Sequence, residues 1–207
     1  MTKARIAMLA FTSVIMIALE GSTAVAQLAG DGVCDRRGYA ILSPWDLSSF
    51  PPGHARIDVY LYRQAMECYI NAERSSQGLP ALIGDSPLNV AARLHAVDAV
   101  AIKWWCGGCD PHTNPVTGTT PDYRIKKAGF CGGRVSSTGE IAYGGYGQGF
   151  ASVQAAMRWW MNSTPHRAAI LNANFRRYGF SYQKGSAFPY WPDVSSGTFI
   201  VTFGSCY

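Results

Sequence analysis

The position of the cysteines constrains this 207-residue chain most, because all six follow an N-terminal segment with the features of an export signal. Lys3 and Arg5 form a basic head, residues 7–19 an apolar run, and residues 24–26, Ala-Val-Ala, a small-residue cleavage site. The apolar run is shorter than the roughly 20 residues that a spanning helix needs. We therefore expect cleavage after Ala26 rather than a membrane anchor, and a protein that is secreted, extracellular or periplasmic, with no later membrane span.

An even number of cysteines in an exported chain favours three disulfides. Six cysteines allow 15 pairings, and the sequence does not choose among them. Three of the six crowd into a glycine-rich region, which we expect to be pinned by its bonds. The disulfide candidates are Cys34, Cys68, Cys106, Cys109, Cys131 and Cys206.

Charge and length exclude some classes of protein. The formal net charge is only +5 and no run of Lys or Arg occurs, so we do not expect nucleic-acid binding. The exported part is long enough for one domain with its own core. We divide the chain into a signal at 1–26, an extended N-terminal segment at 27–55 that Cys34 ties down, and a domain at 56–207.

Hydrophobic periodicity places the helices before most of the strands. Apolar residues at three- and four-residue steps predict helices, and aromatic and β-branched runs predict strands. The expected helices cover about 57–77, 86–102, 122–128, 152–161 and 164–171, and the expected strands 140–143, 178–182 and 198–203. This order predicts an α+β fold rather than a doubly wound α/β fold.

Two histidines and one acid are the best candidates for chemistry. His112 stands in a rigid loop between two prolines, where mere packing is a poor explanation for an imidazole. His166 follows Thr164-Pro165 at the start of a helix, whose dipole disfavours positive charge and keeps the ring neutral near pH 7. Glu140 heads a predicted strand, although alone it would be read as a surface carboxylate. His95 lies on an apolar helical stripe and is interpreted as a core histidine.

The chain resembles the bacterial-type members of the CAP superfamily (SCP-like proteins; cysteine-rich secretory, antigen 5 and pathogenesis-related proteins). The similarity extends over about residues 60–204, and its strength lies in the order of several short motifs. These motifs are Asn71-Ala72-Glu73-Arg74, residues 78–82 (GLPAL), residues 91–95 (AARLH), His112-Thr113, residues 139–144 (GEIAYG), residues 160–167 (WMNSTPHR), residues 170–172 (ILN), residues 178–180 (YGF) and residues 201–204 (VTFG).

This resemblance implies a three-layer α-β-α sandwich, with helices on both faces of a small, mainly antiparallel sheet. It also implies a central cleft of two histidines and two acids that in some members holds zinc or another divalent cation. Carried over by position, the cleft residues are His112, Glu140 and His166, with the two histidines as metal ligands. The second acid departs from the pattern, because Asp110 and Asp122 both match poorly.

Two functions from different classes remain. We favour an exported module that binds a ligand at or near the His/Glu cleft without turnover, the family resemblance suggesting a sterol, another lipid or small apolar molecule, or an extracellular protein partner. The alternative is a metal-assisted hydrolase in which His112 and His166 hold the ion and Glu140 acts as general base. No complete nucleophile set is present, so the protein is more easily read as a non-enzyme.

Two further features bear on that choice. Cys106-Gly107-Gly108-Cys109 matches a redox motif, but a helix precedes it and Asp110-Pro111 follows, which is the wrong context for a thioredoxin-like catalyst. The tryptophan pairs 104–105 and 159–160 lie on predicted helices or their ends, so one ring of each pair should be buried. We assign Trp160 to the core, and Trp159 or Trp105 to an apolar contact site.

Overall fold

The computed structural model describes residues 27–35, 55–134, 136–147 and 149–207. The expected signal at 1–26 and most of the expected N-terminal segment lie outside these residues. The elements, in chain order, are α2 (Ala55–Ser76), β1 (Ile83–Gly84), α3 (Ser86–Ile102), α4 (Pro121–Lys127), a 3-10 turn (Phe130–Gly133), β2 (Ser136–Tyr146), α5 (Val153–Met161), α6 (Thr164–Ile170), β3 (Arg177–Lys184), a second 3-10 turn (Asp193–Ser195) and β4 (Ser196–Cys206). None of the helices in this described part is both long and apolar enough to cross a membrane.

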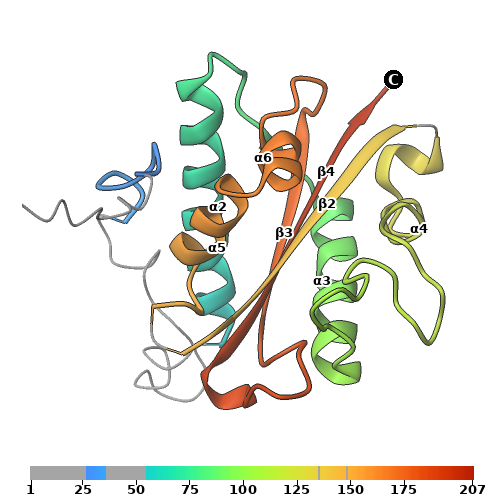
Figure 1. Ribbon diagram of the computed structural model, residues 1–207. Coiled ribbons are helices and arrows are strands. Elements are labelled where there is room, and N and C mark those ends of the chain that lie inside the picture. The colour runs from blue at the N-terminus through green and yellow to red at the C-terminus, as the bar shows by residue number, and fades with distance from the viewer. Residues whose placement is uncertain (1–26, 36–54, 135, 148) are drawn as a thin grey trace, which may run out of the picture.

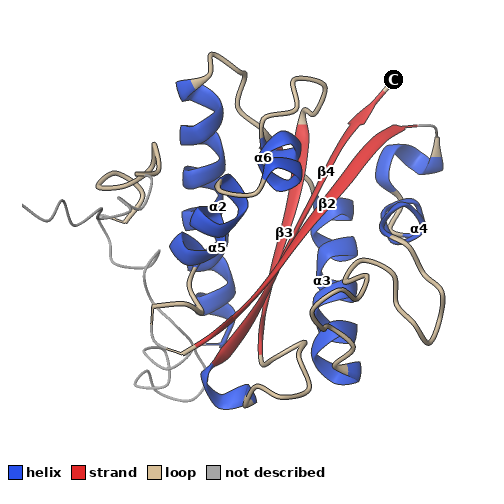
Figure 2. Ribbon diagram, viewed as in Figure 1, coloured by secondary structure: helices blue, strands red, loops and turns tan. Residues whose placement is uncertain are grey.

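The sheet is mainly antiparallel, as expected. Its strand order is β1-β3-β4-β2, with only β1 and β3 parallel. Helices α2, α5 and α6 cover one face and α3 and α4 the other, which gives the three layers of an α-β-α sandwich (Figures 1 and 2). The predicted α+β class is therefore confirmed.

Local sequence explains where the helices begin. The carboxylate of Asp85 accepts a hydrogen bond from the Leu88 amide and caps α3, with Pro87 in its first turn. Ser152 caps α5 in the same way through the Ala155 amide. These polar side chains satisfy backbone donors that the first turn of a helix leaves free.

Strand β2, Ser136–Tyr146, is longer than the strand predicted at 140–143 and includes the glycines on either side of it. All eleven residues of Ser136–Tyr146 pair with β4. The glycines serve close packing: a Cβ on Gly145 would lie 2.1 Å from the backbone oxygen of Phe150, and one on Gly144 2.7 Å from the Phe188 ring. Glycine thus permits contact here and does not interrupt the strand.

Two disulfides join distant parts of the domain and one closes a short loop. Cys34 is bonded to Cys68 of α2, and Cys131 to Cys206 at the end of β4. The third bond joins Cys106 and Cys109, which are only three residues apart. All six cysteines are therefore paired, and no free thiol remains as a nucleophile.

Candidate functional site

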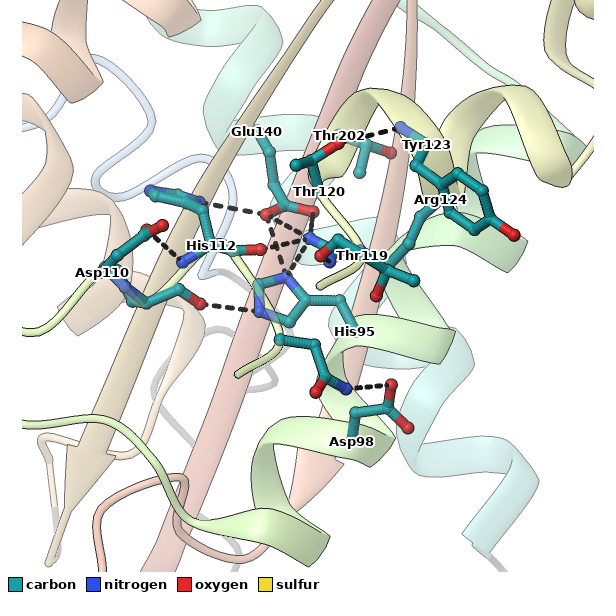
Figure 3. Close-up of polar contacts among 12 residues, drawn as sticks. His95, Asp98, Asp110, His112, Thr119, Thr120, Tyr123, Arg124, Glu140 and Thr202 are labelled. Atoms are coloured by element: carbon teal, nitrogen blue, oxygen red, sulfur yellow. Dashed lines mark hydrogen bonds and ion pairs between the residues drawn. The ribbon is translucent and has the colours of Figure 1, made fainter. Parts of the chain in front are cut away.

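Glu140 lies on β2, the strand at one edge of the sheet, and its side chain is only 1% exposed. Alternation along the strand decides which layer it meets. Ile141 belongs to the core under α2, α5 and α6, whereas Ala142 packs with α3 on the opposite face. Glu140, two residues before Ala142, points to the α3 and α4 side (Figure 3). The expected surface carboxylate is therefore buried.

Three basic side chains surround this carboxylate. Nη2 of Arg124, from α4, lies 3.0 Å from Oε1 and 3.1 Å from Oε2. Nδ1 of His112 lies 3.0 Å from Oε1, and Nδ1 of His95, from α3, lies 2.9 Å from the same oxygen. Segments from α3, the loop after it, α4 and β2 thus meet at one buried charge (Figure 3).

These contacts lower the pKa of Glu140 to about 2. Burial is the largest influence and by itself would raise the pKa, because it disfavours the charged form. The charge of His95, the hydrogen bonds from His112 and His95, and the charge of Arg124 together outweigh it. Glu140 is therefore a carboxylate near neutral pH and can only accept hydrogen bonds.

An ionised Glu140 fixes the proton on the neighbouring ring of His112. His112 must donate from Nδ1, which leaves its Nε2 facing away from the carboxylate. His95 has Glu140 at Nδ1 and the carbonyl oxygen of Pro111 at Nε2, 2.9 Å away. The same Nδ1 also lies 3.2 Å from Nη2 of Arg124, so the ring of His95 is enclosed by Glu140, Arg124 and Pro111. His95 is thus buried as expected, but it is part of the site.

Arg124 connects the cluster to the loop that carries His112. Its Nη1 donates to the carbonyl oxygen of Thr119 at 2.8 Å, and its Nη2 donates to that of His112 at 2.8 Å. The side chain is 4% exposed. Sequence reasoning missed Arg124, because a basic residue in a short polar helix resembles a solvated one.

His166 lies at the third position of α6, the helix that covers the other face of the sheet from α3 and α4. Its Nδ1 is 2.7 Å from the Ser163 hydroxyl, and its ring lies 4.7 Å from that of Trp159. Burial, and next the charge of His112, lower the pKa of His166. The neutral state predicted from the helix dipole is thus favoured chiefly by burial. Among the described residues, no hydrogen bond links His166 to His112 or Glu140.

Neither candidate for the second acid reaches Glu140. Asp110 accepts a hydrogen bond from the His112 amide at 2.8 Å, and its pKa is lowered first by the Thr113 side chain and next by that amide. Asp122 pairs with Lys126 on the surface of α4. The groups that complete the cluster are the bases His95 and Arg124, where the resemblance implied an acid.

The donor set does not fit a catalytic zinc ion, which normally takes three protein ligands and one open position. Both oxygens of Glu140 face Arg124, and one of them also faces two histidines. The ring nitrogens left over belong to His112 and His166 alone. Within the described part of the chain, no group of three or more His, Cys, Asp or Glu side chains is placed to hold a metal ion.

An aromatic pocket of about 280 Å³ lies beside this cluster. It extends around the edge strand, from the α3 side to the α5 side. Its lining residues are Trp105, Cys106, Cys109, Pro111, Ala142, Tyr143, Gly144, Trp159, Phe188 and Trp191. Pro111, the carbonyl partner of His95, belongs to both the pocket and the cluster.

The tryptophan pairs follow the expected division. Trp160 is fully buried and donates from its indole to the carbonyl oxygen of Ala142, while Trp159 is 49% exposed. In the other pair Trp105 is the buried ring, so its proposed place on the surface is wrong. The loop after α3 turns inward at Trp105, which buries its ring against that of Phe188; the two ring centroids are 5.8 Å apart.

Comparisons of this chain with known proteins, by sequence and by structure, point to the same family. The sequence profile of the cysteine-rich secretory protein family, CAP, matches residues 69–204. An outer surface protein of Borrelia burgdorferi is similar in structure, with 24% identity and a TM-score of 0.53, over 72% of this chain and 91% of that chain. An extracellular SCP-domain protein of Bacillus anthracis has 20% identity and a TM-score of 0.54, over 74% of this chain but only 43% of that chain.

These two likenesses concern the fold. None of the curated proteins compared with this chain matches it. The profile match covers most of the domain and includes all the motifs from α2 to β4 that hold Glu140 and its partners in place. The chain therefore belongs to the cysteine-rich secretory protein family, CAP.

Proposed function

We propose that this protein is an exported binding module that takes a small apolar ligand, or the apolar part of a lipid or sterol, into the aromatic pocket without hydrolysing it. The expected signal, the paired cysteines and the extracellular or outer-surface neighbours support export. The main support for binding without turnover is that the carboxylate of Glu140 is buried and already paired with three basic side chains of the protein itself.

A general base must reach a water molecule and take its proton. Glu140 is a poor candidate, because its side chain is 1% exposed and its oxygens accept hydrogen bonds from three basic side chains. Its pKa of about 2 also makes it a weak base near neutral pH. The hydrolase alternative loses the residue on which it depends, whereas a binding site needs no base.

The pocket has the features of a ligand site. Ligand pockets are mostly concave and apolar, with a few polar groups that fix orientation. Five aromatic rings line this one, and Trp159, on its rim, also contacts His166. At about 280 Å³ the pocket is slightly smaller than the usual range for ligand sites, so it suits an acyl chain or a ring rather than an entire large lipid.

Fluorescence titration tests this proposal directly. The probes are cis-parinaric acid, a fluorescent fatty acid, and dehydroergosterol, a fluorescent sterol. We expect saturable binding of at least one probe, and Trp159→Ala should weaken it by roughly fivefold, because an aromatic contact with the ligand contributes about 1 kcal/mol. Tyr123→Ala is the matched control. Tyr123 is also an exposed aromatic residue, but it lies on α4 outside the pocket, so its loss should leave the affinity unchanged.

The same protein is then incubated with nitrophenyl esters, casein and a polysaccharide, with and without zinc. The proposal predicts no turnover that depends on Glu140. Hydrolysis that is lost in Glu140→Gln, at a temperature where circular dichroism shows the variant to be folded, would establish the enzyme instead. Failure of both probes to bind, or equal binding by Trp159→Ala and the unmodified protein, would remove the pocket as the ligand site and favour a protein partner.

A further inference from the structure

The Cys106–Cys109 disulfide differs from the other two in exposure and in place. Both of its cysteines are exposed, whereas Cys34 and Cys68 are each partly buried. In the remaining bond Cys206 is exposed, but Cys131 is partly buried and packs against an apolar cluster. Thiol–disulfide exchange requires a thiolate to reach a sulfur atom, so access is a main determinant of its rate.

The chain between these cysteines leaves the sulfur atoms open to approach. Gly107 and Gly108 have no side chains, and a Cβ placed on either would meet no atom within 4 Å. The two cysteines also line the rim of the aromatic pocket. An incoming thiol therefore meets the short disulfide from solvent, without any displacement of core residues.

The disulfide closes the turn that leads into the buried cluster. The carbonyl oxygen of Asp110 accepts a hydrogen bond from the Trp104 indole, and its carboxylate accepts one from the His112 amide. The next carbonyl, that of Pro111, accepts from His95. A single short loop thus joins the exposed disulfide to His112 and to the partners of Glu140.

We propose that the Cys106–Cys109 disulfide is a thiol-exchange site, opened by an external dithiol and closed again by an external disulfide, and that its opening loosens the loop that holds His112 on Glu140. The other two disulfides, Cys34–Cys68 and Cys131–Cys206, remain closed and hold the domain together while it is open. This site does not depend on the proposed ligand, because it acts on the loop whether or not the pocket is filled.

The exchange is a balanced two-electron reaction. A thiolate of the dithiol attacks the sulfur of Cys106 or Cys109, which forms a mixed disulfide and releases the other cysteine as a thiolate. The second thiol of the reductant then attacks the mixed disulfide. The reductant leaves as a disulfide, and the protein gains two electrons and, after protonation, two protons on its two cysteines.

The site is a substrate for exchange rather than a catalyst of it. Oxidoreductases of the Cys-X-X-Cys type stabilise one thiolate at the N-terminus of a helix. Here α3 has already ended at Ile102, its C-cap residue Lys103 is in the left-handed conformation, and Asp110 follows the second cysteine. The negative end of the helix and a nearby carboxylate both disfavour a stable thiolate.

Selective reduction of the folded protein tests this proposal. The protein is treated with increasing dithiothreitol in the absence of denaturant, the free thiols are alkylated with iodoacetamide, and the modified peptides are identified by mass spectrometry. We expect Cys106 and Cys109 to be alkylated together, roughly tenfold faster than any other cysteine. Removal of the reductant and addition of oxidised glutathione should close the bond again.

The double variant Cys106→Ser/Cys109→Ser is the matched control. It should fold and release no thiol at the dose that opens the short disulfide in the unmodified protein. Earlier or equal opening of Cys34–Cys68 or Cys131–Cys206 would overturn the proposed exchange site, and so would a requirement for denaturant.

The link to the loop has a separate readout, the exchange of the His112 amide hydrogen with solvent. That amide donates to Asp110, so loosening of the loop should speed its exchange by roughly tenfold in the reduced protein. An unchanged rate at His112, in protein with Cys106 and Cys109 fully alkylated, would show that the disulfide opens without affecting the loop and would refute that part of the proposal.

Discussion

Replacement of Glu140 by glutamine should destabilise the protein by about 3 kcal/mol at neutral pH. Glutamine imitates the protonated acid, and the pKa of Glu140 falls from 4.5 to about 2 on folding. Each unit of pKa difference corresponds to about 1.4 kcal/mol between the charged and neutral forms. For a chain of this length, the loss corresponds to a fall of about 6–12 °C in melting temperature.

The pH dependence gives this prediction its sharpest form. Because the folded pKa lies below the unfolded one, the stabilisation is complete above pH 4.5 and disappears as the pH falls towards 2. Urea denaturation at several pH values, with the disulfides intact, measures the free energy of unfolding for both proteins. The two curves should lie furthest apart near pH 7 and converge as the unmodified protein takes up its proton.

Asp122→Asn is the matched control for the loss of a carboxylate. Asp122 pairs with Lys126 on the surface of α4, about half exposed, and such pairs contribute little. We expect a change within about 0.5 kcal/mol and little effect on the pH curve. If Glu140→Gln were as stable as this control at every pH, the buried charge cluster would not stabilise the fold and the reasoning would be wrong.

Three other predictions concern packing and covalent links. Arg74 is fully buried, and its guanidinium donates to four backbone carbonyls. Arg74→Lys should lower the free energy of unfolding by about 3 kcal/mol or more, because the single ammonium group of lysine cannot reach all four carbonyls. Gly179→Ala places a methyl group 2.1 Å from the backbone of α3 and should destabilise by about 3 kcal/mol, whereas Gly107→Ala, in open space, should be neutral in the same denaturation assay. Replacement of Cys131 and Cys206 by serine opens a link across 75 residues and should cost about 4.5 kcal/mol on a chain-entropy estimate, visible as a lower urea midpoint; a loss below about 1 kcal/mol would argue against that estimate.

Features that depend on near neighbours in the chain were predictable from the amino-acid sequence alone. Hydrophobic periodicity located the helices, Asp85 marked the start of α3, and aromatic and β-branched runs located β3 and β4. The order of the motifs indicated the family and, with it, the three-layer architecture. These features are readable because caps and helical faces arise from residues a few positions apart.

Only the tertiary structure decided how the charges pair. Glu140 meets His112 across 28 positions and Arg124 across 16, and no local pattern specifies such contacts. The sequence suggested Glu140, His112 and His166, but placed His95 in the core and overlooked Arg124. Burial made the carboxylate that the sequence offered as a base into the centre of an ion-pair cluster, because a charge removed from water must be neutralised by the groups that the fold places next to it.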